Sequence, residues 1–386
     1  MLDPQTTYSA TAYPAKLTPD VSPLRPHCPA RDRLRLWTPV NNRSTASSVP
    51  HADAQRIQDV MIHAWASSTR EAYGSGILAY HVYCDSKSIE ESSRAPAAST
   101  LISAFISAMA GLYAGKTIAS YVYGIRAWHI LHGIAWVLND NEVDALLKAA
   151  INLTPESSKR KKRQPYTVEF ITSILQKLDP ADPLDAAVGS CLTTAFYSMA
   201  RAGEFTVPNL SSFQAEPTKY VKRSDVRQEV DRNGLKTTVF HLPRTKSSQA
   251  GEDISWAKQH GPSDPEVALA NHFHVNNPPP DGALFAYKHS TNSHRPLTKT
   301  KFIARLAKAA KEAGLNPLQG HGIRIGATLE YLLRNIPFDV VKTMGRWASD
   351  AFQLYLRKHA QILAPYLQAT PILQDEFLRY TMPRVR

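Results

Sequence analysis

The chain has 386 residues, 43% hydrophobic and 20% charged, which is the composition of an ordinary globular protein with two or three domains. No apolar run is long enough to span a membrane, the first thirty residues lack the apolar region of a secretory signal, and three widely spaced cysteines predict neither a disulfide framework nor a zinc site. A net charge of +12 favours a polyanionic partner, although a basic protein without such a partner has the same balance.

Residues 1–50 are predicted to form a disordered leader, because they are rich in proline and sustain no hydrophobic period. From residue 51 to residue 153 the apolar residues recur at helical spacing, as in the predicted helices Ser99–Tyr113 and Lys116–Leu131. No convincing strand interrupts this region. We therefore expect a compact helical domain over residues 51–153.

Residues 154–165 are predicted to be a linker, since they hold no apolar residue between two prolines. The linker contains five consecutive cations: Lys159, Arg160, Lys161, Lys162 and Arg163. Such a run can be a solvated charged loop. It can also be a segment that follows DNA phosphates, a nuclear localisation signal, or a segment with both of these functions. The sequence alone leaves these interpretations open.

Residues 166–370 have a mixed pattern. Residues Leu184–Met199 are predicted to be an amphipathic helix, and Thr298 is expected to cap another. Between them, Lys222–Val230 and Lys236–Leu242 flank an Asn-Gly turn and predict a β-hairpin. The predicted fold class is therefore mainly α with a small antiparallel β element, followed by a tail over residues 371–386.

This last region offers several groups that suit a phosphodiester. His321 and Arg324 stand three residues apart at the start of a predicted helix, so both side chains lie on one face. A guanidinium can hold two phosphate oxygens, and an imidazole beside it can exchange a proton. Tyr355 follows thirty-one residues after Arg324, in a helix predicted to start at Ser349. As a nucleophile its phenol needs nearby cations or a base.

Two further candidates lie upstream. Arg201 follows an apolar helix, and Glu204, three residues later, can orient its guanidinium. Lys246 follows the second strand of the hairpin, where a lysine on a turn can deliver a proton to a leaving oxygen, and Arg244 and Lys236 on the same hairpin are alternatives for that role. Each residue alone has an ordinary structural interpretation, as a cap, a surface ion pair or a core aromatic. Their order along the chain is what carries the functional interpretation.

That order resembles the tyrosine recombinase (phage integrase) family. The strings His321–Ala327 and Gly345–Phe352 are similar to those of recombinases from eukaryotic mobile elements of the Crypton type. The resemblance is strong over about residues 167–367 and weaker over the helical region, where Ser68–Gly74 is similar to a core-binding domain. It implies an N-terminal core-binding domain, a mixed α+β catalytic domain, and a nuclear protein if the host is eukaryotic.

The resemblance also implies a role for each residue. Arg201 and Arg324 would clamp the scissile phosphate, Lys246 would protonate the departing 5′ oxygen, and His321 would assist proton transfer from Tyr355. The tyrosine would attack phosphorus and give a 3′-phosphotyrosyl intermediate, with no cofactor or metal. Double-stranded DNA and a homotetramer on that DNA are the implied partners, with no membrane involved.

One family position is not matched cleanly. The family has His or Trp after a glycine, nine residues before the nucleophile, whereas here Arg346 has that spacing and Trp347 is one residue closer. Residue type favours Trp347 and spacing favours Arg346. Two rival functions also stay open: relaxation of DNA by a type IB topoisomerase, and DNA binding by an element-derived protein without strand exchange.

Overall fold

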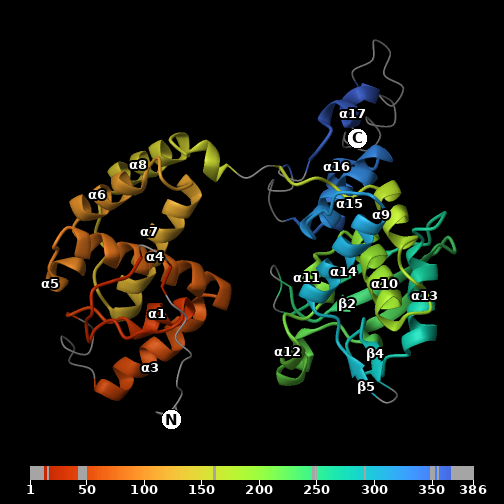
Figure 1. The fold of residues 1–386 in the computed structure, drawn as a ribbon, viewed down its shortest axis with the longest axis horizontal. Coiled ribbons are helices and arrows are strands. Elements are labelled where there is room, and N and C mark those ends of the chain that lie inside the picture. The colour runs from red at the N-terminus through yellow and green to blue at the C-terminus, as the bar shows by residue number, and fades with distance from the viewer. Residues whose placement is uncertain are drawn as a thin grey trace, which may run out of the picture. The chain divides into compact units, whose positions relative to one another are not determined.

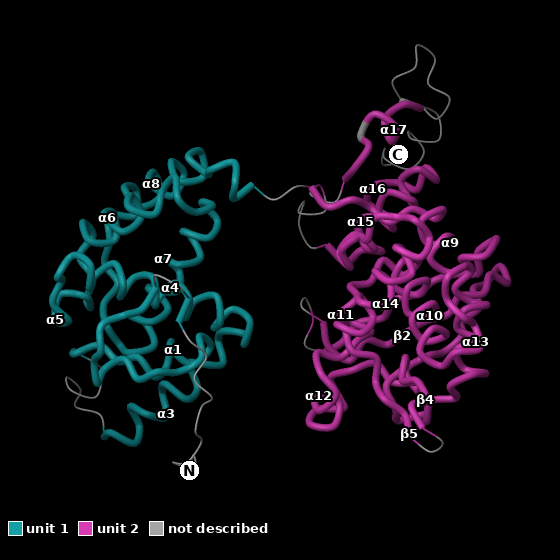
Figure 2. The backbone as a smooth tube through the Cα atoms, viewed as in Figure 1, with its two compact units in different colours: residues 1–161 teal, residues 162–386 magenta. Residues whose placement is uncertain are grey.

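The structure is a computed structural model, which describes residues 13–14, 17–41, 50–159, 162–245, 248, 250–290, 293–347, 353 and 356–366. The chain divides into two compact units, residues Met1–Lys161 and Lys162–Arg386, coloured separately in Figure 2. The division falls inside the predicted linker, where consecutive cations and the absence of apolar residues leave nothing to bury in a core.

Unit 1 is helical, and its two long helices lie against one another (Figure 1). These are α4, Ser67–Ser86, and α7, Gly115–His132. They approach so closely that a Cβ added at Gly124 would lie 2.8 Å from the Tyr73 carbonyl oxygen. Glycine at this position therefore permits the packing. The remaining helices of the unit are α1 Ala30–Leu36, α3 His51–Met61, α5 Glu91–Arg94, α6 Ser99–Met109 and α8 Asp140–Asn152.

The prediction of a disordered leader over residues 1–50 is wrong for residues 17–41. Helix α1 packs against α4, and the side chains of Leu34 and Trp37 are fully buried in the core of unit 1. The indole N–H of Trp128 in α7 donates to the carbonyl of Trp37 over 2.6 Å. A seven-residue helix is too short to show a hydrophobic period, and its burial comes from distant partners such as Gly74, which lies 41 residues from Arg33.

Acid should destabilise unit 1 through His129, a fully buried imidazole. Its Nε2 accepts from the Ala97 N–H over 3.0 Å and its Nδ1 donates to the Ile125 carbonyl over 2.9 Å, so the neutral ring is satisfied. Burial lowers the pKa of His129 from 6.5 to about 4. In that interval the unfolded chain binds the proton and the folded one does not. The free energy of unfolding should therefore fall as the pH is lowered.

We expect this one histidine to account for about 2 kcal/mol between pH 7 and pH 5. Urea unfolding of wild type and His129→Gln at both pH values measures the effect, with the exposed His63→Gln as control. The pH dependence should shrink in His129→Gln and persist in the control. An equal pH dependence in all three proteins would contradict the assignment.

Unit 2 is built around α10, Pro183–Tyr197, whose residues from Asp185 to Tyr197 are all buried. Asp182 begins this helix by accepting the Asp185 N–H over 2.9 Å, with Pro183 in the first turn. The other helices of the unit are α9 Val168–Leu175, α11 Ala202–Phe205, α12 Leu210–Ala215, α13 Pro265–Asn276, α14 Lys299–Glu312, α15 His321–Leu333, α16 Phe338–Met344 and α17 His359–Leu363.

Two antiparallel sheets complete unit 2. The predicted hairpin forms between β1, Val226–Val230, and β2, Lys236–Leu242, and β3, Glu252–Trp256, adds a third strand in the order β1-β2-β3. Strands β4, Tyr287–Ser290, and β5, Ser293–Arg295, form the second sheet. The fold class is thus mainly α with small antiparallel sheets, as predicted. The third strand was missed because its five residues alternate too briefly to show a period.

The start of α15 is held against the segment that enters unit 2. The Tyr166 N–H donates to the Gly322 carbonyl over 3.0 Å, and the Tyr166 hydroxyl donates to the Leu318 carbonyl over 3.2 Å. A Cβ at Gly326 would lie 1.9 Å from the Tyr166 carbonyl oxygen, so only glycine allows this approach. The contact fixes the helix turn that carries His321 and Arg324.

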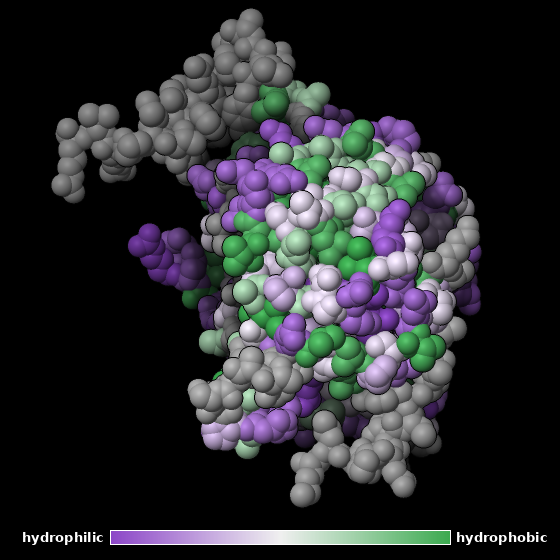
Figure 3. All heavy atoms as spheres, turned by 90° about the vertical axis from the view of Figure 1, so that its left-hand side faces the viewer, coloured by the Kyte–Doolittle hydropathy of each residue, from purple (hydrophilic) through white to green (hydrophobic). Residues whose placement is uncertain are grey.

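No helix in the described part of the chain is long and apolar enough to cross a membrane. Figure 3 views the molecule from the side of unit 1 and shows hydrophilic and hydrophobic residues intermixed on that face. Exposed apolar side chains of unit 1 include Leu112, Val137, Ile151 and Leu153.

Candidate active site

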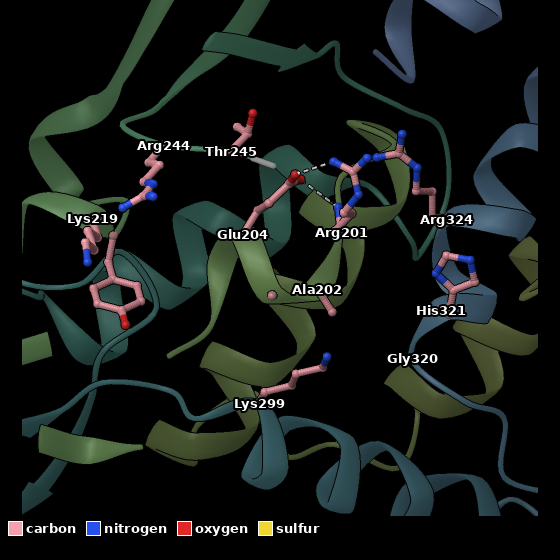
Figure 4. Close-up of a pocket in the computed structure, with 12 residues that line it drawn as sticks. Arg201, Ala202, Glu204, Lys219, Arg244, Thr245, Lys299, Gly320, His321 and Arg324 are labelled. Carbon is pink, nitrogen blue, oxygen red and sulfur yellow. Dashed lines mark hydrogen bonds and ion pairs between the residues drawn. The ribbon is translucent and has the colours of Figure 1, made fainter. Parts of the chain in front are cut away.

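A cationic cavity opens in unit 2, where the starts of α11 and α15 meet the loop after β2 (Figure 4). Segments more than a hundred residues apart in the sequence contribute to its wall. The cations on this wall are Arg201, Lys219, Arg244, Lys299 and Arg324, and the imidazole of His321 lies beside them. Glu204 is the single carboxylate among the lining residues, so the cavity has the charge of an anion site.

Arg201 and Glu204 pair as the sequence predicts. The guanidinium Nη1 of Arg201 donates to Glu204 Oε1 over 2.8 Å, and the backbone N–H of Arg201 donates to Oε2 over 2.8 Å. Burial alone would raise the pKa of Glu204, but the Arg346 charge and hydrogen bonds from Arg346 and Arg201 lower it overall. Glu204 is therefore an ionised orienting group, and Arg201 keeps 31% of its side chain exposed.

Arg324 is buried, with 1% of its surface exposed, yet lines the same cavity. Its Nη1 donates to the Met199 carbonyl over 3.0 Å, and its Nη2 donates to the Gly345 carbonyl. Gly345 is the C-cap of α16, so its carbonyl carries partial negative charge that stabilises the cation. The guanidinium of Arg324 is thereby held in one orientation toward the cavity, close to that of Arg201 in Figure 4.

His321 begins α15 and is half-buried beside these arginines. Burial and then the charges of Arg163, Arg324, Arg201 and Arg357 lower the pKa of His321 from 6.5 to about 4. The imidazole is therefore neutral at pH 7. A neutral ring can accept a proton from an attacking hydroxyl, which a protonated ring cannot do.

Trp347 and Arg346 take different places. The Trp347 ring lies against Arg324, with 4.3 Å between the guanidinium carbon and the ring centroid. It also covers Gly345, where a Cβ would lie 1.6 Å from a ring carbon. Arg346 instead donates to Glu204 over 2.7 Å and to Glu252 over 2.9 Å, and it is not among the cavity-lining residues. Trp347 thus lies against Arg324, whereas Arg346 pairs with Glu204 and Glu252.

Two predicted residues, Lys246 and Tyr355, lie outside the described residues. Thr245, which directly precedes Lys246, lines the cavity, and its N–H donates to the Ser248 carbonyl over 2.8 Å. In the chain, Tyr355 is followed by Leu356, which packs against the core of unit 2. The described groups of the predicted set thus meet at one cavity: Arg201, Glu204, His321 and Arg324, with Trp347 behind them.

The basic linker reaches this site at its C-terminal end. Arg163 donates from Nε to the Gln319 side chain over 3.0 Å, and its carbonyl accepts from Arg357 over 3.3 Å. Lys162 is exposed, and Lys159 pairs with Glu156. Arg160 and Lys161 lie outside the described residues.

Sequence reasoning missed Lys219 and Lys299 on the cavity wall, and Glu252 behind it, whereas Arg244 was an alternative to Lys246 on the same hairpin. Arg244 precedes the predicted Lys246 by two residues and belongs to a basic cluster, which is a weak signal. Glu252 lies 94 residues from its partner Arg346, and no local pattern links them.

The described fold is that of the tyrosine recombinases, including their core-binding region. One similar structure is the XerH site-specific recombinase bound to palindromic difH substrate in a post-cleavage complex, with a TM-score of 0.52 and 12% identity. That likeness covers 88% of this chain and 93% of XerH. A lambda integrase dimer bound to a COC′ core site has a TM-score of 0.49 and 15% identity, over 80% of this chain and 96% of the other. No protein-family model and no curated protein matches the sequence.

Proposed function

We propose that this protein cuts and rejoins double-stranded DNA through a tyrosine nucleophile, as a site-specific recombinase or integrase. The observation that carries the proposal is the cavity itself. Two arginines with fixed orientations and a neutral imidazole meet there, although Arg201 and His321 are 120 positions apart. This arrangement suits a phosphodiester that becomes more negative in the transition state.

In the proposed reaction, the Tyr355 oxygen attacks the scissile phosphorus and loses its proton to His321. The bond from phosphorus to the 5′ oxygen breaks, and Lys246 protonates that oxygen, leaving a 5′ hydroxyl and a 3′-phosphotyrosyl link. Arg201 and Arg324 hold the non-bridging oxygens. Attack by a 5′ hydroxyl on the same link reverses the step and reseals DNA, so no cofactor is consumed.

Trp347 is proposed to support Arg324. Its ring lies against one face of the guanidinium, which limits that group to its in-plane contacts. The ring also supplies apolar bulk beside the cavity. We therefore assign the buttressing role to Trp347, with the backbone of Gly345 giving the ring its space.

Unit 1 and the basic linker are proposed to bind the DNA duplex. The five linker cations, Lys159 to Arg163, would track phosphates, and the overall charge of +12 would make binding strongly dependent on salt. The resemblance to tyrosine recombinases further implies that a tetramer would assemble on two duplexes. An origin in a Crypton-like mobile element and, if the host is eukaryotic, a nuclear location complete the proposal.

The test uses a pool of labelled duplexes with randomised cores, each carrying a nick in one strand. Cleavage near the nick releases a short fragment, so rejoining is prevented and the covalent adduct accumulates. We expect an adduct that survives denaturation, a free 5′ hydroxyl on the released strand, and a DNA-linked peptide containing Tyr355. Mass spectrometry of the digested adduct identifies that peptide.

Other outcomes favour the rival functions. DNA binding without any adduct over the whole pool would indicate an element-derived DNA-binding protein and contradict the proposal. The protein could instead relax supercoiled plasmid through a transient 3′ adduct and exchange no strands between duplexes that yield adducts. That result would favour topoisomerase activity.

A further inference from the structure

A chain of ion pairs runs behind the cavity and joins three segments of unit 2. Glu252, at the start of β3, accepts from Arg346 Nη1 over 2.9 Å. Arg346 Nη2 donates to Glu204 Oε2 over 2.7 Å, and Glu204 Oε1 accepts from Arg201 Nη1 over 2.8 Å. One guanidinium fork thus connects the β-sheet to the arginine on the cavity wall.

The central members of this chain are buried. The exposed fractions of the Arg346 and Glu204 side chains are 9% and 8%, and that of Glu252 is 22%. Ion pairs at this depth are screened little by solvent, and loss of one partner leaves a buried charge without compensation. The chain is therefore unlike an exposed surface pair, which contributes little.

The backbone at Arg346 has a conformation that arginine rarely adopts. Its φ is +57°, in the left-handed region, and the arginine N–H donates to the Thr343 carbonyl over 2.9 Å. Such a conformation costs a non-glycine residue on the order of 1 kcal/mol or more, so glycine would be favoured on backbone grounds alone. Arginine therefore occupies a position whose local geometry disfavours it, and its side chain makes two ion pairs there.

We propose that Arg346 is a positioning residue, which acts through Glu204 on Arg201 and through Glu252 on the base of the β2–β3 loop. Arg346 itself touches no substrate. The inference rests on the proposed function, because its main consequence is the rate of DNA cleavage.

The first consequence concerns Arg201. Glu204 carries one negative charge and binds two arginines, so each guanidinium receives only part of its attraction. Without Arg346, the carboxylate would interact with Arg201 alone and draw it away from the phosphate. The negative charge of Glu204 would also oppose the binding of an anion in the cavity. Arg346 therefore keeps Arg201 available to the phosphate while Glu204 orients it.

The second consequence concerns the loop between β2 and β3, which contains Lys246. This loop ends at Glu252, whose backbone is paired with Leu242 across the two strands. Arg346 binds the Glu252 side chain and so ties the base of the loop to the turn that precedes Trp347. The loop base, the Trp347 turn and Arg201 would then move as one assembly.

The experiment measures single-turnover adduct formation on a nicked duplex selected from the pool as a wild-type substrate. We expect Arg346→Gln to slow cleavage on the order of 10²-fold, because a displaced clamp loses alignment. Arg346→Gly relieves the backbone conformation and should show the same defect, which separates the role of the side chain from backbone strain. Glu252→Gln, which removes only one anchor, should slow cleavage severalfold.

Double variants distinguish positioning from direct contact with the phosphate. In an Arg201→Lys background, Arg346→Gln should slow cleavage by no more than about threefold, because both changes remove the same function. If Arg346 contacted the phosphate itself, its full defect would persist in that background and overturn the proposal.

Arg305→Gln is the matched control. Arg305 forms a partly buried fork with Asp185, with 2.6 Å between Arg305 Nε and Asp185 Oδ1, and it does not line the cavity. Its removal should lower the melting temperature and leave the cleavage rate of the folded protein unchanged. Melting curves of all variants identify the temperature at which each remains folded, and rates are compared there.

If wild type forms no adduct with any member of the pool, the proposed function is contradicted, and with it the positioning role of Arg346. If wild type forms the adduct and both Arg346 variants cleave at the wild-type rate, this inference alone is overturned.

Discussion

Tyr355→Phe should abolish the covalent adduct while leaving DNA binding intact. Phenylalanine keeps the aromatic ring but has no oxygen to attack phosphorus, so no step of the proposed reaction can begin. The rate should fall below detection, which is the largest effect we expect from a single substitution. Adduct formation on the nicked duplex and a binding isotherm at fixed salt measure the two properties separately.

Tyr220→Phe is the informative control, because Tyr220 is a tyrosine on the cavity wall. This variant should form the adduct, since its hydroxyl has no part in the proposed step. An adduct that persists in Tyr355→Phe and disappears in Tyr220→Phe would identify Tyr220 as the nucleophile and contradict our assignment.

Arg324→Lys should slow cleavage by about 10²- to 10³-fold, the loss typical of removing one donor that stabilises transition-state charge. Lysine keeps the positive charge, but one ammonium cannot replace a planar group that binds the Met199 and Gly345 carbonyls and lies against Trp347. DNA affinity should change much less than the rate. Single-turnover cleavage at saturating protein isolates the chemical step.

The same substitution should also destabilise unit 2 by about 1–3 kcal/mol, because a buried carbonyl loses its donor. Arg334→Lys is the control, since Arg334 pairs with Glu330 near the surface and is not a cavity residue. A normal cleavage rate in Arg324→Lys would show that a positive charge alone suffices at this position. It would contradict the proposal that the Arg324 guanidinium holds the phosphate.

The predicted elements agree best with the structure where the prediction rested on residues close together in the sequence. The Asn-Gly turn marked the hairpin, and three-residue spacing placed His321 and Arg324 on one turn of α15. The prediction of a disordered leader was wrong for the opposite reason. Helix α1 is buried by contacts with α4 and α7, and its own sequence shows no hydrophobic period. The outcome at Arg346 and Trp347 shows a further limit, because a shift of one residue decides which side chain faces Arg324.

By itself, the sequence determined the division into two units, the mainly helical class with a small hairpin, and the identity of most groups that suit a phosphodiester. These features depend on composition and on neighbours within a few residues. Over that range, the spacing of residues along a helix or strand sets the directions of their side chains. The tertiary structure decided which cations share the cavity, that the Trp347 ring lies against Arg324, and that Arg346 joins Glu204 to Glu252. Those contacts link residues up to 142 positions apart, and burial rather than sequence spacing gives them their strength.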